Sequence, residues 1–114
     1  MIEILVRNYL LAQNLSAGQN IFLEVPENPP EEYILIEKTG SGKTNHITRA
    51  MMAVQSISRL SMFRAASINE EVLQAMDGII YAEDIFSCEL NSDYNFTNME
   101  TKEYRYQAVF NLFY

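Results

Sequence analysis

The sequence predicts a single-domain α+β protein in which an antiparallel or mixed β-sheet carries two main helices packed on one face. Its length of 114 residues is typical of one domain. Apolar residues alternate with polar ones near the C-terminal end, as in a half-buried strand, and they recur every three or four residues in the middle of the chain, as in an amphipathic helix. We therefore expect one domain over residues 1–114 with the element order α-β-β-β-α-β-β.

The first third of the chain predicts a helix followed by two strands. Apolar side chains have helical spacing over residues 2–13, which indicates an amphipathic helix. Residues 21–25 are expected to form a strand. The proline-rich residues 26–30 form an exposed connector, and residues 32–38 form a second strand because they are rich in β-branched and aromatic side chains.

The next segment predicts a hairpin. Gly40 and Gly42 can adopt positive φ at little cost, so we expect them to form the turn that follows the second strand. Residues 45–59 are then expected to form the returning strand. The run of Ala and Met at 50–53 also fits a helix, but a two-glycine turn favours the strand.

The second main helix is predicted over residues 60–79, where apolar residues have a period of three to four. Asn69 precedes two glutamates, which is typical of a helix start, so we expect the helix to be broken or restarted there. Gly78 is expected to end it.

Two strands are predicted after this helix. Residues 84–90 form the first, residues 91–98 form a polar loop, and residues 102–114 form the second. Alternate residues of the last strand are expected to line one face and to pack beneath the helix: Tyr104, Tyr106, Ala108, Phe110, Leu112 and Tyr114.

Residues 38–44 read Lys-Thr-Gly-Ser-Gly-Lys-Thr and resemble half of a phosphate-binding loop. The pattern requires a glycine five residues before Gly42, where the chain has Glu37. No clean helical stripe follows Lys43, although a helix N-terminus should help to hold the phosphates. A hairpin turn is therefore favoured over a nucleotide site at Gly40 to Thr44.

No residue pattern predicts catalysis, a cofactor or a metal site. His46 is the sole histidine and Cys88 the sole cysteine, and no nucleophile motif accompanies either. One histidine and one cysteine do not make a structural zinc site, and a calcium loop starting at Asp93 lacks the required glycine and glutamate. We expect no enzymatic activity, and we interpret Cys88 as a small buried residue that suits a reducing cytoplasm.

The charge is unevenly distributed. The net charge is −7, which argues against general nucleic-acid affinity. Residues 38–69 contain five basic residues and no acidic one, whereas the remainder contains fifteen acidic residues and three basic ones. Chance clustering on a solvated face is one interpretation. The other is a polar subunit whose basic strip mates with an acidic surface.

This second interpretation predicts a partner interface at the hairpin tip. We expect Lys38 and Lys43 to lie at the exposed end of the hairpin, with His46 and Arg49 just behind them. A basic tip of this kind would engage an acidic neighbour, either another copy of the chain or a different protein. No signal peptide and no membrane-spanning apolar run are recognised in the sequence.

The chain as a whole is similar to the tail-completion or tail-terminator proteins of long-tailed bacteriophages, the minor tail protein U-like family. It resembles most closely the versions from phages and prophages of Gram-positive bacteria. The resemblance is carried by residues 25–30, 33–43, 53–56, 69–72, 75–76, 90–97 and 104–110.

The resemblance implies a structural protein of the virion tail, assembled in the cytoplasm of the bacterial host. Members of this family form a ring, usually of six subunits, that caps the finished tail tube and offers a face to the head connector. DNA passes through the channel without sequence-specific binding, and there are no catalytic residues to carry over. Head–tail joining proteins of similar size are a neighbouring possibility.

Two other classes remain as alternatives. One is a nucleotide- or phosphate-binding module that uses the segment from Gly40 to Thr44, which predicts magnesium-dependent nucleotide binding lost in Lys43→Ala. The other is a small regulatory α/β domain that binds a metabolite between subunits, which predicts a ligand-dependent thermal shift. The ring protein predicts oligomers without a ligand.

Overall fold

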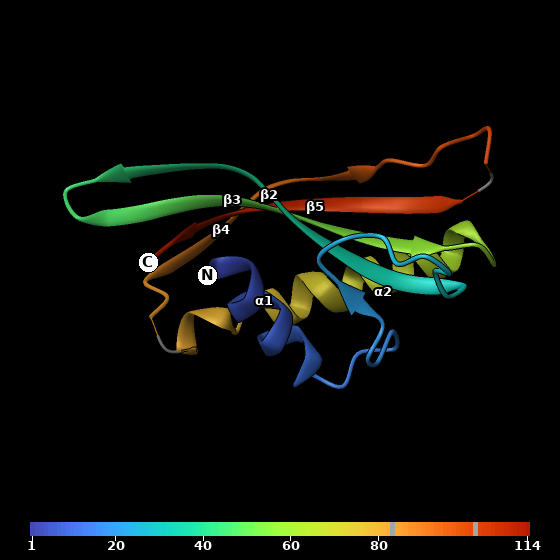
Figure 1. Cartoon of the computed structure of the whole chain (residues 1–114), viewed down its shortest axis with the longest axis horizontal. Helices are drawn as coiled ribbons and strands as arrows, with labels where there is room; N and C mark the ends of the chain where they lie inside the picture. The colour runs from blue at the N-terminus through green and yellow to red at the C-terminus, as the bar shows by residue number, and fades with distance from the viewer. Residues whose placement is uncertain (83, 102) are drawn as a thin grey trace.

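Five strands form one sheet, and two helices lie against one of its faces (Figure 1). The computed structural model describes residues 1–82, 84–101 and 103–114. The elements in chain order are α1 (Ile2–Leu11), β1 (Ile21–Phe22), β2 (Glu32–Thr44), β3 (Ile47–Ser58), α2 (Met62–Met76), the 3-10 helix η1 (Ile79–Tyr81), β4 (Ser87–Asn95) and β5 (Tyr104–Phe113). The predicted fold class and element order are confirmed.

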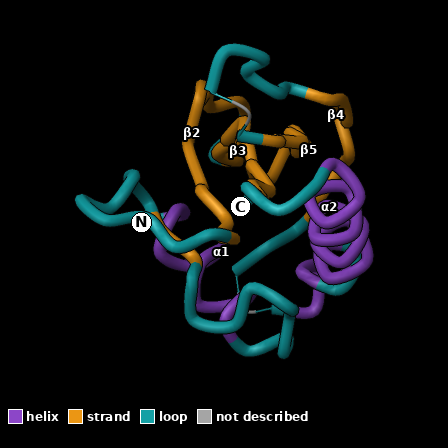
Figure 2. The backbone as a smooth tube through the Cα atoms, turned by 90° about the vertical axis from the view of Figure 1, so that its right-hand side faces the viewer, coloured by secondary structure: helices purple, strands orange, loops and turns teal. Residues whose placement is uncertain are grey.

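The sheet is mixed, with the strand order β1-β2-β3-β5-β4. The short β1 pairs in parallel with β2, and every other neighbouring pair is antiparallel. Figure 2 shows β2 and β4 on the two outer sides of the sheet, with α1 and α2 below it. The chain passes from β3 through α2 to the edge strand β4, and it then returns as β5, which lies between β3 and β4.

The core lies between the sheet and the two helices. Both helices bury a stripe at helical spacing, and alternate residues of the three long central strands point into this core. On the other face of the sheet, Tyr33, Leu35 and Ile57 form a second, smaller buried cluster. The helices contribute Ile2, Val6, Leu10, Ile68, Val72 and Met76, and the strands contribute Ile34, Ile36, Ala50, Met52, Val54, Ala108, Phe110 and Leu112.

The predicted face of β5 is confirmed by this core for its second half, whereas Tyr104 and Tyr106 are only partly buried and lie outside this cluster. Ala108, Phe110 and Leu112 are buried against the helices, and Tyr114 packs partly buried at the edge of the same cluster. The strand predicted over residues 45–59 is also confirmed, as β3. Lys102, the predicted first residue of the last strand, lies outside the described residues.

Helix α2 is continuous, so the predicted restart at Asn69 is wrong. The Ser61 hydroxyl caps the helix by accepting a hydrogen bond from the Arg64 backbone N–H at 3.1 Å. Asn69 lies in mid-helix, 2% exposed, and its amide donates to Asp93 Oδ1 in β4 at 2.7 Å. That tertiary bond satisfies one side of a polar group that would otherwise favour a helix end. The C-cap is Asp77 rather than Gly78.

Strand β4 differs from the prediction in its position. It begins at Ser87 and continues to Asn95, so it includes most of the segment expected to be a loop. Its polar composition reflects its place at the edge of the sheet, where one side faces solvent. A bulge interrupts its register with β5 between Leu90 and Ser92. Strand β1 is also shorter than predicted, since it consists of Ile21–Phe22 alone.

The sheet face that points away from the helices carries a connected row of polar side chains. Arg105 donates to Gln55 Oε1 at 2.9 Å and to Glu103 Oε1 at 2.6 Å, and Gln55 donates to Gln107 at 2.7 Å. Gln107 in turn donates to the Tyr94 hydroxyl. Because these groups bond to one another, the middle of this face offers few unsatisfied groups to a partner.

Candidate functional site

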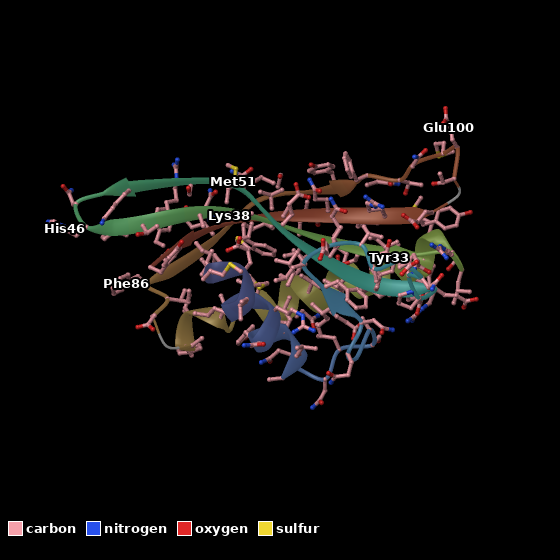
Figure 3. The ribbon with its side chains drawn as sticks, in the orientation of Figure 1. Tyr33, Lys38, His46, Met51, Phe86 and Glu100 are labelled. Atoms are coloured by element: carbon pink, nitrogen blue, oxygen red, sulfur yellow. The ribbon has the colours of Figure 1, made fainter. Side chains whose placement is uncertain are left out.

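The hairpin of β2 and β3 extends beyond the helices at one end of the molecule, which measures 44 × 26 × 25 Å (Figure 1). Figure 3 shows His46 at the far end of this hairpin. The position of the candidate interface at an exposed hairpin therefore agrees with the sequence analysis, although its internal geometry differs.

The turn is formed by Asn45 and His46, not by the two glycines. Both residues have positive φ, 49° and 67°, as a two-residue type I′ hairpin loop requires. Gly40 and Gly42 lie inside β2, paired with Met51 and Arg49, and neither has positive φ. Asparagine tolerates the left-handed conformation, and the pairing of β2 with β3 is thereby extended past both glycines.

The same geometry removes the structural basis of the phosphate-loop interpretation. The segment from Gly40 to Thr44 is strand, it is followed by a turn and another strand, and its backbone takes part in pairing with β3. A phosphate-binding loop needs a curled backbone that leads into a helix N-terminus.

The structure brings only part of the predicted interface together. Lys43 and Arg49 line a hollow of about 310 Å³, together with Gly42, Asn45, Ile47 and Phe113. His46 lies in the exposed turn beside it. Lys38 is exposed but stands farther back, opposite Met52, over the middle of the sheet (Figure 3).

The two cations at the hollow belong to opposite faces of the hairpin. Arg49 pairs with Gly42, and its guanidinium lies 3.6 Å from the position that a Cβ of Gly42 would take. Lys43 pairs with Thr48 and lies on the side of the sheet that faces the helices. The tip therefore presents positive charge to both sides, and the apolar Ile47 and Phe113 lie on the same side as Arg49.

The basic segment is divided in two by the fold. Arg64 forms a two-point ion pair with Glu32, at 2.9 and 3.0 Å, and Arg59 pairs with Glu103 at 3.4 Å, both at the other end of the sheet. Within the described residues no ion pair involves Lys38, Lys43 or Arg49. Within residues 38–69, the positive charge that has no ion-pair partner among the described residues therefore lies in the hairpin.

The ion pair with Arg64 lowers the pKa of Glu32. The hydrogen bond from Arg64, helped by one from the Ser58 hydroxyl, holds the pKa of Glu32 below its ordinary value, although partial burial opposes the shift. Glu32 therefore stays ionised under ordinary conditions.

A second feature was missed by the sequence analysis. A hollow of about 250 Å³ lies between α2 and β4, and it is lined by Leu73, Gln74, Met76, Asp77, Cys88, Leu90 and Phe110. Burial, with the neighbouring Asp77 and Glu89, raises the pKa of Cys88 to about 11. The sequence feature that could have revealed this acidic edge is the segment from Asp77 to Thr101, which has six acidic residues and no basic one.

The described residues show no arrangement suited to catalysis. No group of three His, Cys, Asp or Glu side chains is placed to hold a metal ion in this part of the chain. No hydrogen bond among the described residues joins His46 to Cys88 or to a serine. What the hairpin offers chemically is cationic and apolar contact surface.

No helix in the described ranges combines the length and the apolar character that crossing a membrane would require.

Among the comparisons with known proteins, the one with solved structures found a match. No protein-family model matches the chain, and no curated protein matches it. Among solved structures, the chain is similar to a chain of the "Virion of native gene transfer agent (GTA) particle". The two folds superpose with a TM-score of 0.80 at 16% sequence identity, over 95% of this chain and 90% of the other. At this identity the likeness establishes a shared fold.

Proposed function

We propose that this protein is a structural subunit of a phage-type particle and that it acts as a tail-completion protein. The observation that carries the proposal is the match of nearly the whole chain to a chain of a gene transfer agent virion particle, at a TM-score of 0.80. The match covers most of both chains, so it concerns a complete fold rather than a common substructure. It agrees with the family resemblance of the sequence.

In this function the protein forms a ring, with six copies as the expected number, that caps the tail tube and meets the head connector. The virion tail is its location, after assembly in the bacterial host cytoplasm. DNA passes through the ring without sequence-specific contacts, which suits a chain whose net charge is −7. No cofactor, metal or catalytic step is part of the proposal.

The hairpin is the proposed contact surface of the ring. Lys43, His46 and Arg49 lie at its end and Lys38 farther back, all exposed. An exposed ion pair contributes less than about 1 kcal/mol, so such contacts act through repetition around a ring. Because the hairpin projects from the body, it can reach a neighbouring subunit or the tube without rearrangement of the core.

The test is assembly on tail tubes followed by electron microscopy. Tubes grown from the tail tube protein of the same particle should stop at a defined end bearing a ring when the protein is added. The variant Lys43→Glu with Arg49→Glu should keep its circular dichroism spectrum but bind tubes more weakly at low salt, and its difference from the wild type should shrink as salt rises, because salt screens exposed charges.

A matched control adds negative charge elsewhere. Gln13 and Gln19 are exposed and lie outside the hairpin, so Gln13→Glu with Gln19→Glu should assemble as the wild type does. Tubes that grow on unchanged and bare-ended in the presence of wild-type protein would show that the function is a different one.

A further inference from the structure

Both edges of the sheet are free over part of their length. Among the described residues, β1 pairs with β2 only at Ile34 and Leu35, and residues 36–44 of β2 have no strand on their outer side. In the same part of the chain, no strand lies on the outer side of β4 along Ser87–Asn95. Figure 2 shows these two strands on the opposite outer sides of the sheet. Each free edge presents unpaired backbone N–H and C=O groups to any strand that can dock.

The free stretches of the two edges lie at the same end of the sheet. Pairing across the strands places Lys38, Met52, Phe110 and Leu90 in one row. A second row contains Ser41, Ala50, Leu112 and Cys88. Residues 38–41 of β2 are therefore level with residues 88–90 of β4.

The strand directions also match. Strand β3 is antiparallel to both β2 and β5, and β4 is antiparallel to β5, so β4 runs antiparallel to β2. A second copy that continues the sheet therefore brings its β2 antiparallel to β4 of the first copy, with the helices of both on the same side. This is the ordinary geometry of strand addition.

The two edges carry opposite charge on each face. On the side that faces the helices, β2 offers Lys38 and Lys43, whereas β4 offers Asp93 and α2 ends at Asp77. On the opposite side, the guanidinium of Arg49 from β3 lies beside Gly42 of the β2 edge, whereas the β4 edge carries Glu89.

One acid interrupts the basic edge. Glu37 lies at the beginning of the free part of β2, on the side of the sheet that points away from the helices. Pairing of two β2 edges would bring lysines together, and pairing of two β4 edges would bring acids together. Charge thus favours the unlike pair.

Two glycines lie on the basic edge. Gly40 follows the bulge of β2 after Lys38, and the guanidinium of Arg49 lies beside Gly42. Glycine in a strand interior often marks a bulge or the close approach of another backbone. Because neither residue carries a side chain, both positions leave room for a strand from outside the chain.

The hollow between α2 and β4 provides a matching feature on the acidic edge. Leu73, Leu90 and Phe110 line it, and Asp77 stands among them. An apolar surface with a carboxylate suits a lysine side chain, whose aliphatic part is buried while its ammonium group reaches the acid.

We propose that the free edge of β2 in one copy pairs with β4 of the next copy, so that the sheet continues from subunit to subunit. The proposal rests on the proposed function, because this contact is the one repeated around the ring. A contact between two different surfaces generates a closed ring when its rotation closes. The partner is thus a second copy of this chain.

Cross-linking between two single-cysteine chains tests the contact. In a Cys88→Ser background, Ser41→Cys marks the β2 edge and Asn91→Cys marks the β4 edge, both at exposed positions. A short bismaleimide should give covalent dimers when the two chains are mixed and none with either chain alone. A mixture of the Gln13→Cys and Asn91→Cys chains is the control and should give none.

A charge swap gives a second measurement. Lys38→Glu with Lys43→Glu in the Ser41→Cys chain should lower the dimer yield about tenfold at low salt, as expected if exposed pairs of under 1 kcal/mol are lost twice. Asp77→Lys in the Asn91→Cys chain, on the same side of the sheet as Lys38 and Lys43, should restore part of it. A reduced yield that the swap does not restore would mean that these edges do not meet.

The outcomes separate this contact from the proposed function. Rings on tail tubes without a link between positions 41 and 91 overturn the edge contact and leave the function intact. Linked dimers in solution with no ring on tubes support the edge contact and overturn the function. If neither the link between positions 41 and 91 nor a ring on tail tubes is observed, the edge contact and the proposed function are both wrong.

Discussion

Phe110 gives the most direct test of the core. Its side chain is 3% exposed and lies on the face of β5 beneath α2, and one side of the ring borders the hollow between α2 and β4. Replacement of Phe110 by alanine removes the ring from contacts with both the helix and the neighbouring strands. The backbone pairing of β5 with β3 and β4 is not altered directly.

The size of the effect follows from the burial and from the neighbouring hollow. Loss of a fully buried phenylalanine costs about 3–5 kcal/mol. Because the 250 Å³ hollow already adjoins the ring, the new space opens toward it and water can enter. We therefore expect the lower end of the range, about 3 kcal/mol, which is about 12 °C in Tm for a domain of this size.

Urea unfolding followed by circular dichroism measures this loss. Phe63→Ala is the matched control, because Phe63 is 76% exposed on α2 and alanine is a good helix former. The control should change the free energy of unfolding by less than about 0.5 kcal/mol. A loss below about 1 kcal/mol for Phe110→Ala would refute the assignment of this face of β5 to the core.

Three further outcomes are expected. The hydrogen bond from Arg64 lowers the pKa of Glu32 in the folded protein. The stability that this bond provides is therefore complete above the ordinary pKa of 4.5 and is lost as pH falls through the lower pKa of the folded state. Glu32→Gln should thus destabilise the protein more at about pH 6 than at about pH 3. His46→Gly should raise the free energy of unfolding by about 0.5–1 kcal/mol, since φ is 67° at His46, and a decrease in urea unfolding would contradict the turn assignment. The pKa of Cys88 is raised to about 11 from 9.0, so its thiolate fraction at about pH 8 should be about a hundredfold below that of the urea-unfolded chain. The rate of its reaction with a disulfide reagent should fall by the same factor. Equal rates in the folded and unfolded chains would mean that Cys88 is not shielded.

The element order was predictable because the strongest patterns in the sequence belong to buried elements. The alternation around Phe110 and the helical period around Val72 both arise from one apolar face, and both faces are in the core. Strand β3 was predictable from its proximity to a turn signal, despite helix-favouring residues at 50–53.

The details that were wrong depend on tertiary partners. Gly40 and Gly42 are strong local turn signals, yet the turn forms at Asn45 and His46 because strand pairing continues past the glycines. Asn69 has the local features of a helix start, but it is held in mid-helix by a residue of β4 that no local pattern indicates.

The candidate interface was predictable only in part. The absence of acids between Lys38 and Asn69 identified the basic segment, but it did not reveal that Arg59 and Arg64 are neutralised by Glu103 and Glu32. Those partners are far away in sequence. The acidic edge was obscured because the polar residues of β4 were interpreted as a loop, which an edge strand resembles.

The bulges of β2 and β4 divide the sheet into two mechanical parts. Both flank the row that contains Met52 and Phe110, one beside Lys38 and the other beside Leu90. A bulge increases the local right-handed twist, so the twist of this sheet is concentrated at one level. On one side of that level lies the body, and on the other the hairpin arm that extends past the helices (Figure 1). The direction of the hairpin arm relative to the body is therefore fixed at this row, whose Met52 and Phe110 are both buried in the core.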